Sequence, residues 1–179
     1  MTNQVPILFV LDTNVFIEAH RRYYAQDLCP GFWECLTHYS QEKRMLSIDR
    51  VRVELMEGPN NQDTPDKLAE WVKNAPNDLF ISSAEQSVVD VFAEMMDWVR
   101  RNDQFRPEAK AEFARVADGW VAAYAKGHNA IVVTQEQFSP DVKKRVPLPN
   151  VCRQFGIIYQ DTFDMLREIE VRFDWRQHR

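Results

Sequence analysis

An uninterrupted apolar run near the N-terminus, Ile7 to Leu11, constrains the fold of this chain more than any other feature. Its residues do not follow the spacing of a helix, so the run predicts a strand that is buried on both faces. The run ends at Asp12, which is followed by Thr13 and Asn14. Asp12 is therefore expected at the C-terminal end of a strand, the edge at which open α/β sheets bind their ligands. Two interpretations remain open, because a side chain of this type also caps helices.

Composition and charge limit the classes of protein to which the chain can belong. Its 179 residues are 45% hydrophobic and include 5 glycines, which favours a single packed domain over residues 1–179. The formal net charge of −5 gives no overall attraction for nucleic acid, so such binding would depend on local basic patches or on a metal held by acidic residues. No apolar run approaches the ~20 residues of a membrane-spanning helix, and the N-terminus lacks the features of a signal peptide. We therefore expect a cytoplasmic protein that does not contact membranes.

The cysteines predict reduced thiols rather than a disulfide framework. Cys29, Cys35 and Cys152 form an odd set without a C-x-x-C pair, which is typical of a reducing compartment. Cys29, Cys35 and His38 could be imagined as a zinc cluster. They lack a fourth ligand at the spacing of a zinc finger, so the sequence does not favour zinc.

Short apolar segments alternate with helical patterns along the rest of the chain. Strands are expected at residues 45–48, 79–81, 130–134 and 156–159, and helices at about 15–24, 32–43, 50–57, from 65 through 72, 84–102, 107–125, 150–155 and 162–173. Ser83 to Gln86 has the pattern of a capping box and predicts the start of the helix that ends near residue 102. Helices that cross between strands predict a three-layer α/β/α sandwich, with a central, mainly parallel sheet of roughly four to five short strands.

Four carboxylates are notable for their positions. Asp12 and Glu136 follow buried strands, whereas Glu54 and Asp118 lie within otherwise apolar helical segments. A buried carboxylate needs hydrogen bonds, cations or a metal to offset its desolvation. If all four converge at the carboxyl edge of the sheet, their repulsion opposes joint ionisation unless a divalent cation is present. Mg²⁺ or Mn²⁺ suits such a site better than zinc, since no cluster of His or Cys accompanies the carboxylates.

The segments around these carboxylates resemble, in order, the acidic motifs of the PIN domain family. The matching segments are Leu11–Asn14, Val53–Leu55, Ala117–Ala125 and Val132–Glu136. Together with Glu18–Tyr24, they look like an uncharacterised PIN-like subfamily of bacterial and archaeal proteins. The resemblance extends from the first expected strand to the last expected helix.

The resemblance implies a PIN-like fold and a nuclease dependent on Mg²⁺ or Mn²⁺, often the RNA-cleaving toxin of a type II toxin–antitoxin pair. Asp12, Glu54, Asp118 and Glu136 align with the acidic positions that hold the metal and carry catalysis. Asn14 and Thr134 match polar residues that position a carboxylate or the attacking water. The fourth acidic position is more usually Asp, and Glu136 lies two residues beyond Thr134, so Glu136 could act through water. The family also implies an antitoxin partner and a homodimer.

Basic residues interleaved with aromatic residues suit the binding of a single nucleic acid strand. His20, Arg21 and Arg22, followed by two tyrosines, are expected to bind single-stranded or structured RNA, with DNA left open. The alternative is a solvated face with the tyrosines packed in the core. Lys143–Arg145 are interpreted as solvated, and Arg172, Trp175, Arg176 and Arg179 form a third candidate.

Two other function classes stay open on the sequence. One is a PIN-like module that binds RNA or protein without turnover and keeps its carboxylates for structure. The other is a small α/β phosphatase, which is weaker because nothing resembles a nucleophile flanked by a phosphate-binding loop.

Overall fold

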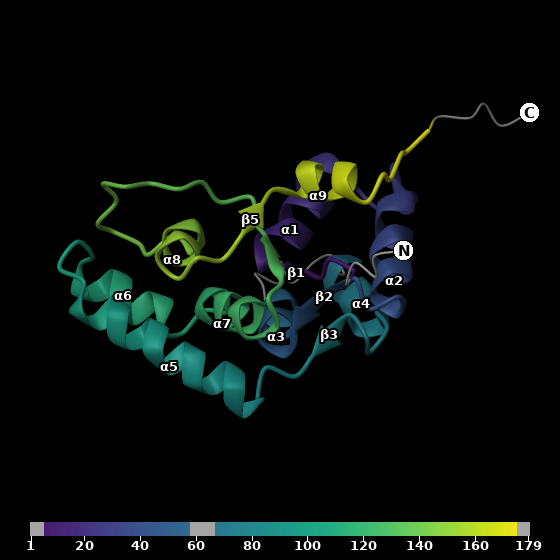
Figure 1. The fold of residues 1–179 in the computed structure, drawn as a ribbon. Coiled ribbons are helices and arrows are strands. Elements are labelled where there is room, and N and C mark those ends of the chain that lie inside the picture. Colours follow the sequence, from purple (N-terminus) through teal and green to yellow (C-terminus); the bar gives the residue numbers. More distant parts are fainter. Residues whose placement is uncertain (1–5, 58–66, 175–179) are drawn as a thin grey trace, which may run out of the picture.

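The computed structural model describes residues 6–57 and 67–174, and its centre is a five-stranded parallel sheet with the order β3-β2-β1-β4-β5 (Figure 1). All the strand pairs in this sheet are parallel. The strands are β1 (Phe9–Leu11), β2 (Met45–Ile48), β3 (Phe80–Ile81), β4 (Ile131–Val133) and β5 (Tyr159–Gln160). The prediction of a central parallel sheet of short strands is confirmed. The expected start of a helix at Pro65 and the tail residues Trp175, Arg176 and Arg179 lie outside the described residues.

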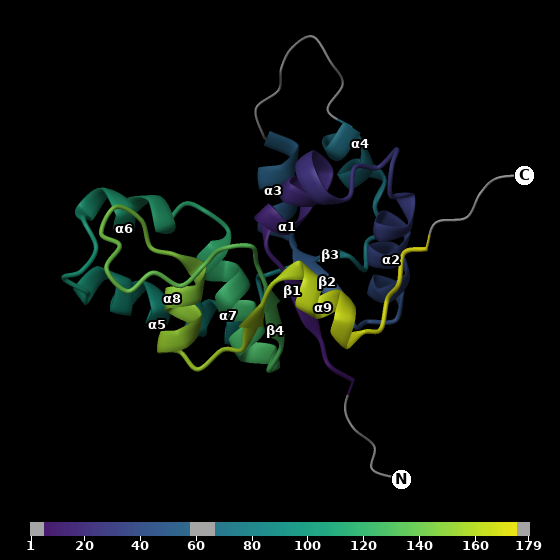
Figure 2. The same cartoon turned by 90° about the horizontal axis from the view of Figure 1, so that it is seen from above.

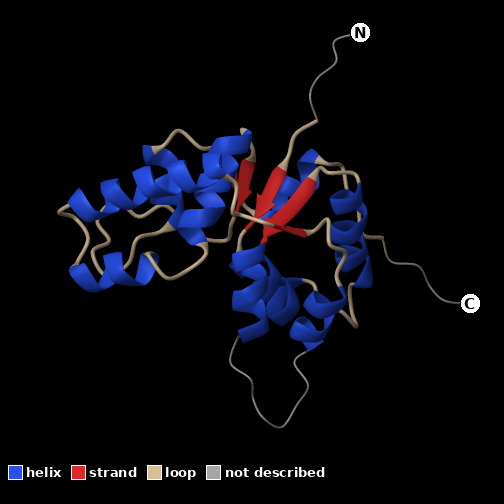
Figure 3. Ribbon diagram, turned by 90° about the horizontal axis from the view of Figure 1, so that it is seen from below, coloured by secondary structure: helices blue, strands red, loops and turns tan. Residues whose placement is uncertain are grey.

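Helices cover both faces of the sheet, so the predicted three-layer arrangement is confirmed as well. α5, α6, α7 and α8 gather on one side of the sheet, and α1, α2 and α9 lie on the other (Figures 2 and 3). The helices are α1 (Thr13–Glu18), a π-helix (Ala19–Tyr23), α2 (Pro30–Gln41), α3 (Asp49–Glu57), α4 (Lys67–Asn74), α5 (Gln86–Arg101), α6 (Pro107–Phe113), α7 (Asp118–His128), α8 (Leu148–Gln154) and α9 (Thr162–Glu168). Among the described residues, no helix is both long and apolar enough to cross a membrane.

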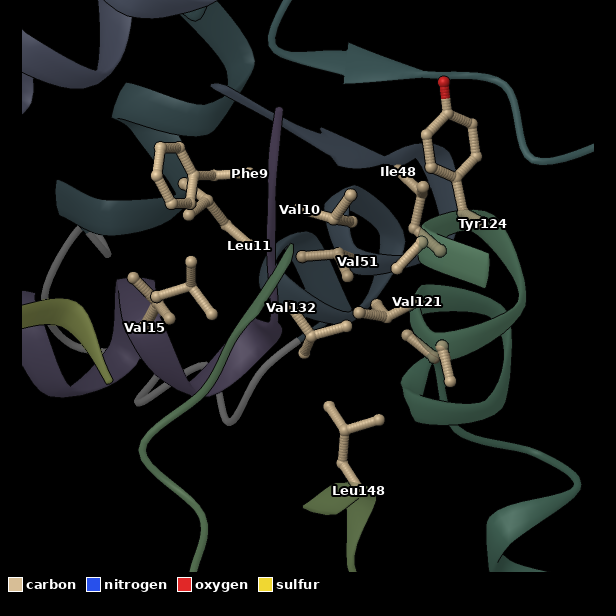
Figure 4. Close-up of a cluster of buried hydrophobic side chains, with 14 of the residues drawn as sticks. Phe9, Val10, Leu11, Val15, Ile48, Val51, Val121, Tyr124, Val132 and Leu148 are labelled. Carbon is tan, nitrogen blue, oxygen red and sulfur yellow. The ribbon is translucent and has the colours of Figure 1, made fainter. Parts of the chain in front are cut away.

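β1 is buried on both faces, as predicted, but it is shorter than the apolar run, since Ile7 is 41% exposed. Phe9, Val10 and Leu11 are each 0% exposed. Because side chains alternate along a strand, Val10 points to the side of the sheet that carries Val121 of α7, and Phe9 and Leu11 point to the opposite side (Figure 4). Val132 of β4 lies on the same side as Val10. β1 therefore joins the two halves of the hydrophobic core.

The predicted capping box at Ser83 is wrong, since α5 begins at Gln86, two residues later than the pattern implies. The Ser83 hydroxyl donates to Asp49 Oδ1 (2.7 Å), and the Ser83 N–H donates to the same oxygen (3.2 Å). Glu85 occupies the N-cap position of α5 without a side-chain cap hydrogen bond. Ser83 is thus engaged by the carboxylate at the start of α3, a tertiary contact that its own local sequence does not reveal.

Two helix boundaries also differ from the predictions. The expected helix over residues 107–125 is divided into α6 and α7, so Asp118 lies in the first turn of α7 rather than in mid-helix. The last helix ends at Glu168 instead of near residue 173. Glu170 adopts a positive φ of 59°, the left-handed conformation that terminates helices.

Close packing along α7 predicts opposite effects for two glycine substitutions. A Cβ at Gly119 would lie 2.9 Å from the Phe92 ring and 3.1 Å from the Phe113 ring, whereas a Cβ at Gly127 would lie 3.8 Å from Val88. Gly127→Ala should therefore raise the free energy of unfolding by ~0.5–1 kcal/mol through helix propensity. Gly119→Ala should lower it by ~1–2 kcal/mol, because overpacking exceeds that gain. Urea denaturation of both variants checks the prediction, and equal stabilisation by the two would contradict it.

Candidate functional site

Asp12 lies directly after β1, at the carboxyl edge of the sheet, and its side chain is tied to the structure on both oxygens. Its backbone N–H donates to Val133 O (3.0 Å) and extends the pairing of β1 with β4. Oδ1 accepts from the Thr13 N–H (2.7 Å), and Oδ2 accepts from the Thr134 hydroxyl (2.9 Å). Asp12 is 2% exposed. The carboxylate therefore caps α1, and the same buried position also places it among the other acidic side chains.

Asn14 and Thr134 form a hydrogen-bonded bridge between the start of α1 and the end of β4. Asn14 Nδ2 donates to Thr134 Oγ1 (3.1 Å), and Asn14 Oδ1 accepts from the Gln135 N–H (2.9 Å). The Thr134 hydroxyl in turn donates to Asp12. Thr134 donates to Asp12 directly and Asn14 holds the Thr134 hydroxyl, so this chain of contacts orients the Asp12 carboxylate.

Glu54 reaches the same edge from α3. Its Oε2 accepts from the Thr13 hydroxyl (2.5 Å), and its Oε1 accepts from the Ala117 N–H (2.7 Å) at the beginning of α7. A carboxylate is favoured at a helix N-terminus, where the unpaired N–H groups carry partial positive charge. Glu54 thus connects α1, α3 and α7 around the site.

Glu136 is held in a similar way in the loop that follows β4. Its Oε2 accepts from the Leu148 N–H (2.9 Å) at the start of α8, and its Oε1 forms an ion pair with Arg145 Nη1 (3.0 Å). The Glu136 side chain is 19% exposed and that of Arg145 is 55% exposed. Arg145 therefore supplies a cation at the edge of an otherwise acidic site.

A cavity of about 290 Å³ brings these groups together. Its lining includes Glu54, Asp118, Glu136 and Arg145, with the apolar and acidic residues Ala109, Glu112, Phe113, Val116 and Val146. Three of the four predicted acidic residues thus line a single cavity. Asp12, the fourth, is buried close enough to influence the ionisation of Asp118.

Burial and mutual repulsion raise the pKa of two carboxyl groups. Burial raises the pKa of Asp12 to about 7; the charges of Glu136 and Glu54 add to this, and the hydrogen bonds from Thr134 and Thr13 oppose it. Burial, followed by the charges of Asp12, Glu136 and Glu54, raises the pKa of Asp118 well above its ordinary value. Ionisation of Asp12 and of Asp118 is therefore unfavourable unless a positive charge lies nearby.

Cys152 of α8 lies beside these carboxylates and was not singled out by its sequence pattern. Its side chain is fully buried, and burial together with the charges of Asp12 and Asp118 raises the pKa of its thiol. The raised pKa keeps Cys152 protonated and unreactive at neutral pH. Cys152 therefore contributes apolar packing next to the acidic site.

The donor set suits a hard cation held by few protein ligands. Within residues 6–57 and 67–174, no three His, Cys, Asp or Glu side chains are grouped so as to enclose a metal ion. Glu54 and Glu136 already accept two hydrogen bonds each. Mg²⁺ commonly binds through one or two carboxylates and keeps several waters. Asp12 also accepts two hydrogen bonds, but Asp12 and Asp118 are the pair whose pKa values are raised, so their ionised forms gain most from a bound cation and they could bind it directly.

The predicted substrate-binding residues His20, Arg21 and Arg22 are not brought to this cavity. They lie on the π-helix that follows α1, about 10–15 Å along the helix axis from Asp12. The His20 ring packs edge-on against Trp33 (6.5 Å between centroids), and Arg22 pairs with Glu18 (3.3 Å). The site instead includes Arg145, whose basic run was interpreted as solvated.

Thr13 is the other residue of the site that the sequence did not single out. Its N–H binds Asp12 and its hydroxyl binds Glu54, so it links two of the acidic side chains. Its position between Asp12 and Asn14 was the available signal. Its contact with Glu54 joins residues 41 positions apart and could not be read from local pattern.

Comparisons with known proteins agree with this fold. A family model described as "Domain of unknown function (DUF4411)" matches residues 9–173. The fold is similar to the crystal structure of VapBC2 from Rickettsia felis bound to a DNA fragment from their promoter, with a TM-score of 0.55 and 13% identity over 87% of this chain and 98% of that chain. It is also similar to DNA-bound VapBC from Salmonella typhimurium, with a TM-score of 0.51 and 17% identity over 87% of this chain and 98% of that one. No curated protein matches the sequence. These likenesses show a PIN-like fold.

The raised pKa of Asp12 predicts how stability depends on pH when metal is removed. A carboxyl group whose folded pKa of about 7 exceeds its ordinary value of 3.8 destabilises the folded state as pH rises through this window. In the presence of chelator, Asp12→Asn should raise the free energy of unfolding at pH 8 by ~2–4 kcal/mol, and the difference should disappear towards pH 4. Thermal unfolding of both proteins from pH 4 to 8 measures this.

The same pair of proteins tests metal binding. Mn²⁺ should raise the melting temperature of the wild-type chain at pH 8, because a ligand that binds only the folded state stabilises it. In Asp12→Asn, the rise in melting temperature caused by Mn²⁺ should be a small fraction of the rise in the wild-type chain. An equal rise in both proteins would contradict a role for Asp12 in binding the metal.

Proposed function

The chain belongs to the DUF4411 family, and we propose that it is a metal-dependent nuclease, specifically an endoribonuclease that hydrolyses phosphodiester bonds. The observation that carries the proposal is the convergence of Glu54, Asp118 and Glu136 on one cavity, with Asp12 buried beside them, at the carboxyl edge of a parallel sheet. Excess negative charge in a buried site requires a cation, and oxygen ligands select Mg²⁺ or Mn²⁺.

A metal bound at Asp12 and Asp118 would lower the pKa of a water molecule and offset charge on the phosphoryl oxygens. The chain's own residues have separate tasks. Thr134 and Asn14 hold the Asp12 carboxylate in one orientation. Glu54 and Glu136, fixed by backbone N–H groups, are placed to accept hydrogen bonds from water in the cavity, and either could accept the proton of the attacking water. Hydrolysis of this kind does not need the 2′-hydroxyl, so the proposed preference for RNA must come from substrate binding.

We also propose a protein partner. The structures described above are VapBC2 bound to a DNA fragment from their promoter and DNA-bound VapBC. By analogy with these assemblies, the chain would act in the cytoplasm as the toxin of a type II toxin–antitoxin pair, restrained by a cognate antitoxin. The likeness of fold to these structures supports the proposed antitoxin partner.

One observation favours a second candidate, a PIN-like module that binds RNA or protein without turnover. Both oxygens of Glu54 and of Glu136 are engaged by donors within the protein, and such carboxylates would serve to join α3, α7 and α8. This candidate predicts that Mn²⁺ has no effect on the integrity of any nucleic acid. The two functions are therefore separated by a cleavage assay.

Cleavage of RNA tests the proposed function directly. Wild-type protein with Mg²⁺ or Mn²⁺ should cleave a mixed RNA substrate, and chelator should stop the reaction. Asp118→Asn should lower the rate at least ~100-fold while leaving the fold intact, because it removes a ligand charge from the cavity without changing shape. Gel analysis of end-labelled RNA and of single-stranded DNA measures the loss and the preference between them.

Asp164→Asn is the matched control. Asp164 is an exposed carboxylate on α9 that pairs with Arg167 (2.8 Å), away from the cavity lining. Its substitution should change the rate less than ~2-fold, in keeping with the small energies of surface ion pairs. Absence of metal-dependent cleavage by the wild-type chain, or full activity of Asp118→Asn, would replace the nuclease proposal with the binding module.

A further inference from the structure

The loop between β4 and α8, residues 134–147, is fastened to another part of the chain at the point where its basic residues begin. Gln104 Nε2 donates to Pro140 O (2.8 Å) and to Val142 O (2.9 Å). The Arg106 N–H, at the start of α6, donates to Lys143 O (2.9 Å). This loop is the green segment that passes towards α6 in Figures 1 and 2. Its basic residues are therefore held in place by the connection between α5 and α6.

These contacts gather cations on one surface, which we call the basic strip: Arg106, Lys143, Lys144 and Arg145. All four residues are exposed. In the described part of the chain, only Arg145 of this set forms an ion pair. The acidic sequence neighbours Asp103, Glu108 and Asp141 are exposed and make no ion pair with the strip among the described residues.

Several other exposed arginines pair with acids on the same helix, whereas Arg21, Arg50, Arg153 and Arg172 form no ion pair among the described residues. Arg100 and Arg101 both pair with Asp97, at 2.5 and 2.6 Å. Arg167 pairs with Asp164. Lys143 and Lys144 keep their charge available for a ligand next to Arg145, in a chain whose formal net charge is −5.

The basic strip is continuous with the acidic cavity. Arg145 both belongs to the strip and lines the cavity, where it binds Glu136. A polyanion approaching the acidic cavity is repelled by its carboxylates, so it needs cations beside the entrance. A flexible chain of phosphates could lie along the strip and present one phosphate to the cavity, whereas a single small anion would need only Arg145.

We propose that the basic strip binds the sugar–phosphate backbone of single-stranded RNA next to the cavity, an inference that rests on the proposed nuclease function. The strip takes the role that the sequence pattern assigned to His20, Arg21 and Arg22. Those residues follow α1 at the end remote from Asp12, and Arg22 is paired with Glu18. Lysines suit this role because backbone contacts need charge rather than a shaped hydrogen-bonding fork.

The test compares two double variants of equal charge change in the full-length chain: Lys143→Ala/Lys144→Ala and Arg21→Ala/Arg22→Ala. Fluorescence anisotropy with a labelled single-stranded RNA, in chelator so that no cleavage occurs, gives the dissociation constant at several salt concentrations. The lysine variant should bind roughly 10-fold more weakly at low salt, with the slope of log K against log salt reduced by about 1.4 for two lost phosphate contacts. The arginine variant should change affinity less than ~2-fold. Single-stranded DNA serves as the second probe for backbone contacts.

A small phosphodiester separates this inference from the proposed function. Bis(p-nitrophenyl) phosphate has no chain to reach the lysines, so its Mn²⁺-dependent hydrolysis should be the same in the lysine variant and the wild type. Unchanged RNA affinity in the lysine variant, a larger loss in the arginine variant, or no RNA binding by the wild type would overturn the inference. Loss of RNA affinity in the lysine variant without hydrolysis by any form of the protein would keep the strip as an RNA-binding surface and remove the nuclease.

Discussion

The parallel pairing of β1 with β4 is the constraint on which the rest of the site depends. Leu11 is in register with Val133, so the chain leaves both strands at the same level. Asp12 and Thr134, the next residues of each, then meet through a hydrogen bond of 2.9 Å. A slip of one residue in either strand would turn these side chains to opposite faces and would expose part of the apolar run. The same register that buries Val10 and Val132 thus aligns the polar residues that follow them.

Helix starts supply the second level of organisation. The Ala117 N–H at the beginning of α7 binds Glu54, and the Leu148 N–H at the beginning of α8 binds Glu136. These donors offset two of the negative charges and hold their side chains around the cavity. Burial, followed by the charges of the neighbouring carboxylates, raises the pKa values of Asp12 and Asp118. If these carboxylates were ionised together they would repel one another, and a cation would relieve that repulsion.

Charge is also distributed unevenly over the surface of the molecule. The chain as a whole is acidic, with a formal charge of −5, yet the β4–α8 loop places lysines beside the acidic cavity. The anchoring groups, Gln104 and Arg106, come from the connection between α5 and α6. That connection is distant in sequence from the loop, so the strip forms only when the helices of this half pack on α7. Local electrostatics of this kind decide where a polyanion approaches, because charges separated by more than a Debye length are screened.

Much of the fold was determined by the sequence alone, because continuous apolar runs ending in polar residues predict buried parallel strands. The order of the acidic motifs also indicated which carboxylates belong to the candidate site. The tertiary structure decided what local pattern could not: Ser83 is bound by Asp49 instead of capping α5, Arg145 lines the cavity, and His20 packs against Trp33. Each of these outcomes depends on contacts between residues far apart in the chain. Periodicity reports which face of an element is buried, whereas only packing determines which polar groups meet at its ends.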